Sequence, residues 1–598
     1  MDSVTLTIDG RAVTVEKGKT VLQAAIEHGL SIPYYCYHPG LGIDGSCRVC
    51  VVRIEKMAKL QTACSTVCTE GMIVQTETPD VVQARAGVLE FLLVNHPLDC
   101  PVCDKGGECP LQDFAYSFGP GDSRMEFPRR VFDGEGVKGD VDFGPTLMLN
   151  RNRCILCTRC VRFMKEIDGD AQIGVVARGN DSQIATFAEQ GVHSILSGNL
   201  MDVCPVGAIT TRDYRFKSRP WDNPDAVDTI CTLCSKGCNT TAWIKAKPEW
   251  AKGARLVRFT PRYEPAVNGY WMCDIGRFDY HWIEGDSRLQ SPFVREEAGH
   301  QQATTWEAAL RTLGERTAST ASQGFTFLTS AHASNEEIFL IERLASAIAV
   351  SWTVSEKRQP SNTKFVVPAV DAPNINGARD LGLPIGDAAR GPDLQALRQA
   401  IEAGQVPALY VFDPGPDGSL GDVSWVLAAR QSGKLPLLVY QGVLMTELAR
   451  AADIVLPGSA WVEKDSTYTN DQGRVQPAAR VFAPPGEALD DREIFTRVAR
   501  VIGQELPYRT PADIRAAIAE MLGPDSAYGK LASIDFARPV PARHWLSQSN
   551  PSERWKWDFM FQEVNIQKWD GLTPTMPQLN IIPLTPVQDA PVPEGEAR

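Results

Sequence analysis

The stretch CILCTRC at residues 154–160, followed far along the chain by Cys204-Pro205, decides how this 598-residue sequence is interpreted. Three cysteines with two residues between neighbours, completed by a distant Cys-Pro, form the pattern with which bacterial ferredoxins hold a 4Fe-4S cluster. A tight turn between two such cysteines presents both sulfurs to one cluster. No cysteine lies between Cys160 and Cys204, so this segment is predicted to hold a single cluster.

Three further sets of four ligands flank this one, and all four sets lie before residue 274. In chain order they are Cys36, Cys47, Cys50 and Cys64; His96, Cys100, Cys103 and Cys109; Cys154, Cys157, Cys160 and Cys204; and Cys231, Cys234, Cys238 and Cys273. We call them the first, second, third and fourth sets. They use fifteen of the sixteen cysteines. The remaining one, Cys68, is predicted to be a small buried hydrophobe.

The framework of the first set can be predicted from the residues before it. Apolar residues alternate over residues 4–8, Asp9-Gly10 predicts a turn, and the alternation resumes, which indicates a β-hairpin. Thr20 and Gln23 have the spacing of a capping box at the start of a helix. A hairpin, a helix and a glycine-rich cysteine loop follow one another as in a plant-type ferredoxin, so we expect a β-grasp domain with a 2Fe-2S cluster.

The second set depends on a histidine. Thr78-Pro79 predicts the start of a helix that ends at Asn95-His96-Pro97, because proline cannot continue it. An isolated histidine is more often a cap or a surface residue, but His96 precedes a C-x2-C-x5-C run by three residues, which favours ligation. A neutral imidazole in place of a thiolate raises the cluster's potential.

Residues 119–145 are predicted to form a loop. Gly134, Gly136 and Gly139 within it match G-x-G-x-x-G, but a strand and a helix do not flank them, so we do not expect nucleotide binding there.

Zinc is the alternative ligand for any single C-x2-C pair. Four successive sets, one of them with a remote Cys-Pro, favour iron and sulfide instead. Disulfides are not expected, because no cleavable leader precedes the first predicted strand and a reducing compartment keeps thiols free. A zinc-stapled assembly scaffold remains the alternative of another functional class.

The composition excludes two roles. A net charge of −13 argues against a nucleic-acid-binding surface. No stretch approaches the roughly 20 apolar residues of a transmembrane helix, so we expect membrane contact through partner subunits only.

The region after residue 281 is predicted to be α/β. Buried parallel strands are expected at residues 325–329, 408–412 and 435–440, each followed by helical spacing. From about residue 540 the chain is rich in Pro, Gln and Asn and carries aromatic residues that suit docking on a partner: Trp545, Trp555, Trp557, Phe559 and Phe561.

Four cluster sites in this order, with the histidine-containing one second, resemble the G-subunit family of bacterial NADH:quinone oxidoreductase, the respiratory complex I. Later segments resemble the molybdopterin oxidoreductase family: WEAAL (306–310), SNEE (334–337), ADIVLP (452–457), EKDSTYTN (463–470) and GRVQ (473–476). The resemblance covers nearly the whole chain.

The resemblance implies a multidomain α+β and α/β protein. The expected domains are a 2Fe-2S ferredoxin domain (1–78), a helical 4Fe-4S segment with one histidine and three cysteine ligands (79–118), a 4Fe-4S ferredoxin-like domain (143–215), a 4Fe-4S domain of molybdopterin-oxidoreductase type (224–280), a degenerate molybdopterin-oxidoreductase-like region with a parallel sheet (281–540) and an extended docking tail (541–598).

The resemblance also implies a function. Electrons would come from NADH through FMN on a partner subunit and pass toward quinone, with the third set carrying them out of the second and the fourth lying off the main path. The expected cofactors are one 2Fe-2S and three 4Fe-4S clusters, without catalytic residues of the chain's own. Other peripheral-arm subunits would be partners, the membrane arm indirectly, at the cytoplasmic side of a bacterial inner membrane.

Two related enzymes remain alternatives. An NAD-linked formate dehydrogenase subunit would need molybdenum, yet no cysteine follows Cys273 to coordinate it, so a bound molybdopterin is not expected. An all-iron hydrogenase would need further cysteines in its catalytic domain, and none remain. Arg48, Arg159 and Arg162 lie beside ligands and are expected either to favour the reduced clusters or to be solvated charges.

Overall fold

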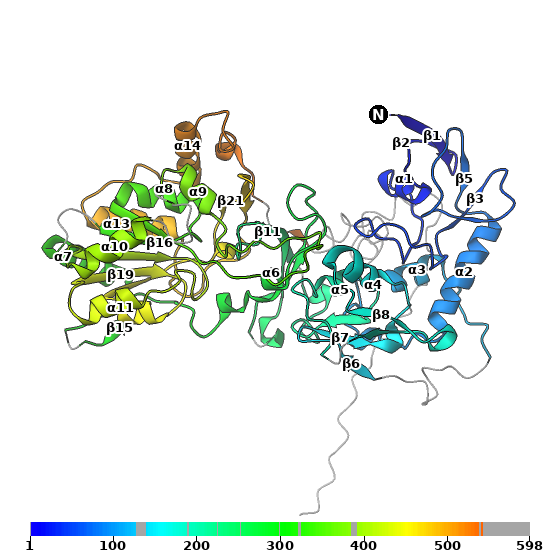
Figure 1. Ribbon diagram of the computed structural model, residues 1–598, viewed down its shortest axis with the longest axis horizontal. Helices are drawn as coiled ribbons and strands as arrows, with labels where there is room; N and C mark the ends of the chain where they lie inside the picture. The colour runs from blue at the N-terminus through cyan, green and yellow to red at the C-terminus, as the bar shows by residue number, and fades with distance from the viewer. Residues whose placement is uncertain are drawn as a thin grey trace, which may run out of the picture.

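The computed structural model describes residues 2–126, 139–187, 190–223, 225–251, 253–297, 299–320, 325–383, 385, 392–536 and 540–541. Two lobes lie side by side, with strand β11 and helix α6 between them (Figure 1). The N-terminal lobe holds the predicted ligands, and the C-terminal lobe holds the large sheet. Gly134, Gly136 and the aromatic residues of the predicted tail lie outside the described residues.

The chain begins with a five-stranded sheet of order β2-β1-β5-β3-β4. Its elements are β1 (Ser3–Ile8), β2 (Arg11–Glu16), α1 (Val21–Glu27), β3 (Val51–Ile54), β4 (Gln61–Thr62) and β5 (Ile73–Gln75). The predicted hairpin is confirmed, because β1 and β2 pair antiparallel around Asp9-Gly10. The predicted capping box is confirmed too, since Thr20 and Gln23 bond reciprocally. Cys68 is 3% exposed and packs in this domain's core, as predicted.

Helices and small sheets surround the second and third sets. The elements are α2 (Pro79–Val94), α3 (Pro110–Phe118), β6 (Asp140–Asp142), β7 (Leu147–Asn150), α4 (Arg159–Phe163), β8 (Ile173–Val176), β9 (Gln183–Thr186), α5 (Asn199–Val203) and β10 (Ile209–Thr211). Helix α2 begins after Thr78 and ends before Asn95, as predicted. The predicted loop over 119–145 is wrong at its end, because β6 pairs with β7 there. Its sequence, Asp-Val-Asp, makes a short charged edge strand that has no apolar signal.

An antiparallel sheet of order β13-β12-β11-β23 stands between the lobes. It comprises β11 (Asp225–Ile230), β12 (Asn239–Ile244), β13 (Leu256–Pro261) and β23 (Val540–Pro541), and α6 (Asp274–Phe278) follows β13 in the chain.

The C-terminal lobe is built on a seven-stranded sheet of order β15-β14-β20-β19-β18-β16-β17. The strands are β14 (Phe293–Arg295), β15 (Gln301–Ala303), β16 (Phe325–Ser330), β17 (Ala345–Ser351), β18 (Ala408–Asp413), β19 (Leu437–Gly442) and β20 (Ile454–Pro457). The three predicted strands correspond to β16, β18 and β19, which pair parallel as expected. Every residue of β18 and β19 is buried, as a parallel sheet covered on both faces requires.

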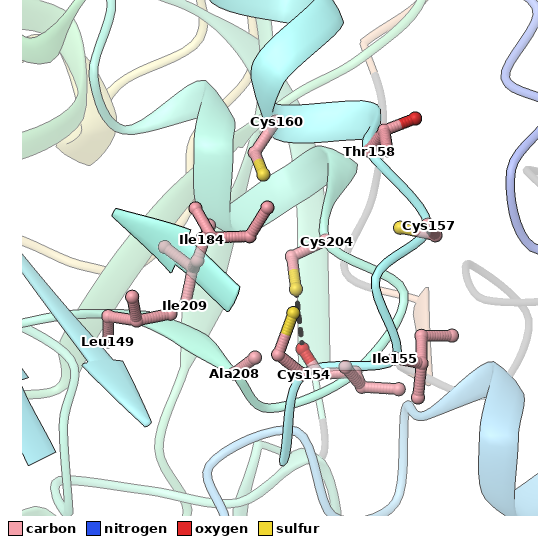
Figure 2. Close-up of a pocket in the computed structure, with 11 residues that line it drawn as sticks. Leu149, Cys154, Ile155, Cys157, Thr158, Cys160, Ile184, Cys204, Ala208 and Ile209 are labelled. Atoms are coloured by element: carbon pink, nitrogen blue, oxygen red, sulfur yellow. Dashed lines mark hydrogen bonds between the residues drawn. The ribbon is translucent and has the colours of Figure 1, made fainter. Parts of the chain in front are cut away.

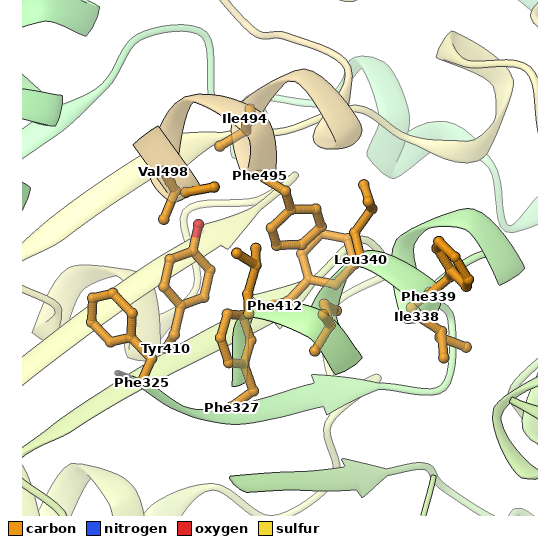
Figure 3. Packing of buried hydrophobic residues seen from close by; sticks show 14 of the residues in the cluster. Phe325, Phe327, Ile338, Phe339, Leu340, Tyr410, Phe412, Ile494, Phe495 and Val498 are labelled. Carbon is orange, nitrogen blue, oxygen red and sulfur yellow. The ribbon is translucent and has the colours of Figure 1, made fainter. Parts of the chain in front are cut away.

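Helices cover both faces of this sheet. They are α7 (Trp306–Thr320), α8 (Asn335–Leu344), α9 (Ile375–Asp380), α10 (Pro392–Glu402), α11 (Ser424–Gln431), α12 (Glu447–Ala451), α13 (Asp491–Val501) and α14 (Pro511–Leu522), with a hairpin of β21 (Ser466–Thr469) and β22 (Val475–Ala478) alongside. On one face, Phe327 and Phe412 meet Phe495 of α13 (Figure 3). The molecule is therefore a multidomain α/β protein with mixed sheets, one of them largely parallel. Among the described helices, none is long and apolar enough to cross a membrane.

Candidate metal centres

Ligands from all four sets lie in one contiguous apolar core, which reaches from the N-terminal lobe to Phe365 and Val367. Its members include Cys36 of the first set, Cys109 of the second, Cys157, Cys160 and Cys204 of the third, and Cys231, Cys238 and Cys273 of the fourth. All sixteen cysteines lie in the described part of the chain, and none of them forms a disulfide bond there. In the described part of the chain, no three His, Cys, Asp or Glu side chains form a single-ion site.

The four thiols of the first set contact one another. The Cys36 and Cys47 sulfurs are 3.4 Å apart, and the Cys64 thiol bonds to both Cys36 and Cys50. Hydrogen bonding with Cys47 and Cys64 lowers the pKa of Cys36, so its thiolate is stabilised. Left-handed backbone at Gly45 and Arg48 bends the loop around the set.

The second set lies between helices α2 and α3. His96 follows the last turn of α2, where burial, helped by the charge of Arg153, lowers its pKa to about 4. The ring is therefore neutral near pH 7, which is the form that ligates a metal. Cys103 and Cys109 are buried, whereas Cys100 is exposed, the one exposed thiol of the sixteen.

All four cysteines of the third set line one cavity, which contains about 340 Å³ of atom-free space, open solvent included (Figure 2). Leu156 and Thr158, which lie between the cysteines, have φ of +54° and +59°. Such left-handed conformations are costly for residues other than glycine and cluster at functional loops. One result is that the Leu156 N–H points at the Cys154 sulfur, 3.4 Å away.

The environment of this cavity fits a metal cluster. Burial raises the pKa of Cys154 to about 12 and that of Cys157 to about 11. Thiolates without a metal are therefore disfavoured in the cavity. A cationic metal centre would compensate their negative charge. Ile184 and Ile209 complete the wall with apolar side chains.

The fourth set lies where the two lobes meet. The Gly276 N–H donates to the Cys273 sulfur at 3.5 Å, and a β-carbon on Gly276 would lie 2.8 Å from the Cys231 sulfur. Residues of the C-terminal lobe hold the loop from Cys234 to Cys238. Asn470 donates to the Lys236 carbonyl at 3.2 Å, and the Asp471 N–H donates to the Ser235 carbonyl at 2.7 Å.

Two arginines connect the third set to the first. Arg159 and Arg162 project from α4 and donate to the carbonyls of Tyr37 and Cys36, respectively. Arg162 also donates to the Leu41 carbonyl at 3.1 Å. The sequence predicted that these arginines lie beside ligands, and they do; Arg48 is exposed.

The Cys-Pro segment connects the third set to the second. The Cys109 thiol donates to the Pro205 carbonyl at 3.8 Å. A β-carbon on Gly207 would lie 2.0 Å from the Cys103 sulfur, so only glycine allows this approach. Gly207 was not predicted from the sequence, although a glycine three residues after Cys204 was a visible signal.

Family models match four stretches of the chain. Residues 1–79 match a 2Fe-2S iron-sulfur cluster binding domain, and residues 85–124 match the NADH-ubiquinone oxidoreductase-G iron-sulfur binding region. Residues 144–210 match the ferredoxin-like domain of NADH-quinone oxidoreductase subunit 3, and residues 371–501 match molybdopterin oxidoreductase.

Curated relatives extend the similarity over most of the chain. The mitochondrial NADH-ubiquinone oxidoreductase 78 kDa subunit of Neurospora crassa is 31% identical, over 88% of this chain and 84% of its own length. The NADH-quinone oxidoreductase G subunit of Rickettsia bellii is 29% identical over 90% of this chain and 92% of its own. The G subunit of Streptomyces coelicolor is 42% identical over 52% of this chain and 36% of its own.

The thiol-rich core and these matches agree. The chain belongs to the G-subunit family of NADH-quinone oxidoreductase, as an iron–sulfur subunit with 2Fe-2S and 4Fe-4S cluster-binding domains and a molybdopterin-oxidoreductase-like C-terminal region.

Proposed function

We propose that the first set holds one 2Fe-2S cluster and that the second, third and fourth sets each hold one 4Fe-4S cluster. The contacts among the four thiols of the first set support this assignment, as does the neutral, half-buried ring of His96. The predicted domain limits, from 1–78 to 541–598, are part of the same proposal.

Electrons would pass in the order first, third, second set. The observation that carries this order is the segment Cys204–Gly207, which supplies a ligand of the third set while touching Cys103 and Cys109 of the second. On its other side, the third set is tied to the first through Arg159 and Arg162. The third set is therefore proposed to lie between the first and the second. The sequence had instead led us to expect it after the second set in the path.

The clusters, when bound, supply one-electron chemistry, and the chain's own residues set their positions and charge. The apolar core around the ligands excludes water and keeps the dielectric constant low. The buried Arg159 places positive charge between two sets, which favours the reduced, more negative cluster. No acid, base or nucleophile is needed.

The fourth set is proposed to stabilise the fold rather than to conduct. Its cysteine loop is bonded to Asn470 and Asp471 of the C-terminal lobe, so a cluster there would fasten one lobe to the other.

The C-terminal lobe is proposed to lack molybdopterin. No cysteine follows Cys273. The side chains of the segments that resemble molybdopterin oxidoreductases bond to one another. Glu336 is fully buried and accepts from Thr467 at 2.9 Å, and Lys464 pairs with Glu337. These side chains serve packing.

Membership of a multisubunit complex implies hetero-oligomeric partners. We propose that these are the flavin- and NADH-binding subunit and other peripheral-arm subunits, at the cytoplasmic side of a bacterial inner membrane. The tail 541–598 is proposed to dock on one of them.

The order of transfer is tested in the assembled complex with Cys204→Ser and, as a matched control, Cys231→Ser. After rapid mixing with NADH and freezing, electron paramagnetic resonance follows each reduced cluster. With Cys204→Ser the first set should be reduced while the second stays oxidised, and with Cys231→Ser both should be reduced as in the parent complex. Prompt reduction of the second set in Cys204→Ser would refute the order.

A further inference from the structure

Tyr35 is a buried hydroxyl that the proposed electron path does not use. The residue precedes Cys36 in the chain, has 0% of its surface exposed, and belongs to the apolar core that contains the ligands. Its hydroxyl oxygen has no hydrogen-bond partner among the described residues. Leaving a buried hydroxyl without a hydrogen bond is unfavourable, so an acceptor is expected beside this fully enclosed hydroxyl in a ligand-rich core.

The surroundings of Tyr35 indicate where that acceptor is. Its ring meets Phe114 of α3 edge-on, with the centroids 5.3 Å apart. Helix α3 begins directly after Cys109, which is its N-cap. Burial raises the pKa of Tyr35, and electrostatic interactions with Cys109, then Cys47, then Asp113 raise it further. The ring of Tyr35 thus packs on the helix that begins at Cys109, and the ligands whose charges act on its hydroxyl belong to the second set and, to a smaller extent, the first.

We propose that the Tyr35 hydroxyl donates a hydrogen bond to sulfur of the second set's cluster, at the Cys109 thiolate or an adjacent sulfide. The inference rests on the ligand sets proposed above. Hydrogen bonds to cluster sulfurs stabilise the reduced state and raise the potential. Tyr35 is thus a positioning residue that makes the histidine-containing cluster a better electron acceptor.

The test uses the full-length chain, assembled anaerobically with iron and sulfide, and the variant Tyr35→Phe. Redox titration followed by electron paramagnetic resonance should show a lower midpoint potential for the second cluster alone. A roughly tenfold weaker electron affinity corresponds to about 59 mV for one electron. In the parent protein, an exchangeable proton coupled to that cluster should disappear in deuterated buffer, and Tyr35→Phe should lack it from the start.

Tyr37→Phe is the matched control. Tyr37 is also buried and lies in the same loop, but its hydroxyl bonds to Gln23, so the second cluster's potential should not change. Iron content and the signal of the first cluster report whether each variant has folded.

Three results in Tyr35→Phe would overturn the inference: an unchanged midpoint potential of the second cluster, a shift confined to the first cluster, or an exchangeable proton coupling that persists. A persisting coupling would mean that another group donates to the cluster, as expected if the Tyr35 hydroxyl donates to Asp113 instead. Failure of the ligand proposal itself is distinguishable, because the parent chain would then carry no clusters.

Discussion

A single glycine lets two candidate centres approach each other. Gly207 faces Cys103, which lies far from it along the chain. The spacing of the cysteines allowed each set to be predicted from the sequence, because the ligands of one cluster are mostly close along the chain. The contact at Gly207 and the enclosed hydroxyl of Tyr35 could not be predicted, since each depends on tertiary packing between separate segments.

Gly207→Ala should therefore disrupt the second set. The added methyl would collide with the Cys103 sulfur and displace that ligand, so the reduced signal of the second cluster should be lost or altered while the first cluster's signal remains. Gly87→Ala is the control, because its β-carbon meets nothing within 4 Å; in helix α2 it should stabilise by roughly 0.5–1 kcal/mol. An unchanged spectrum in Gly207→Ala would contradict the described contact.

The carboxyl of Asp413 should make the C-terminal lobe pH-sensitive. Burial raises its pKa to about 7, while Ser419 and the Gly415 N–H bond to it. Because the folded-state pKa exceeds the unfolded one, its stabilising contribution is complete below about pH 4 and is lost as the pH rises to about 7.

Asp413→Asn should remove this dependence and raise the free energy of unfolding at pH 8, by at most about 4 kcal/mol. Thermal unfolding across pH 4–8 measures it, with Asp525→Asn as control, because Asp525 is exposed and does not act on Asp413. If the thermal stability of Asp413→Asn and that of the parent chain changed with pH in the same way, the raised pKa of Asp413 would be contradicted.

At the scale of elements, local patterns predicted the hairpin, α1, α2 and the parallel strands, because each has its own periodicity and capping residues. The buried ion pairs that join elements in the C-terminal lobe were not predictable. Lys464 lies 2.5 Å from Glu337 of α8 and 2.6 Å from Asp491 of α13, and all three side chains are fully buried. The sequence offered these residues as family motifs without indicating that they pair.

Lys464→Met should destabilise the C-terminal lobe by about 3–5 kcal/mol, because it leaves two buried carboxylates without their cation. Chemical unfolding measures this change. Arg398→Ala breaks an exposed pair with Glu402 and should cost at most about 1 kcal/mol. Equal losses in the two variants would mean that the buried pairs do not hold the elements together.

At the scale of the whole molecule, the fourth set and the strand β23 join two lobes that differ in architecture. The sequence predicted four centres and an α/β region, but not that the cysteine loop of the fourth set would lie against the β21–β22 hairpin. Because of this contact, the fourth set is proposed to be structural, whereas the other three sets are proposed to carry electrons.

Cys231→Ser should therefore lower the stability of the lobe junction by more than about 2 kcal/mol, as loss of a structural metal centre does. Limited proteolysis and the thermal midpoint report the change. A junction as resistant as in the parent protein would show that the fourth centre is not structural.

The most direct test of the account is the metal content and spectrum of the full-length chain, prepared anaerobically with iron and sulfide. We predict a brown protein that contains iron and sulfide in the amounts required by one 2Fe-2S and three 4Fe-4S clusters, with the paramagnetic signals of both kinds after reduction. A colourless chain that binds zinc, or no metal, and gives no such signals would contradict it.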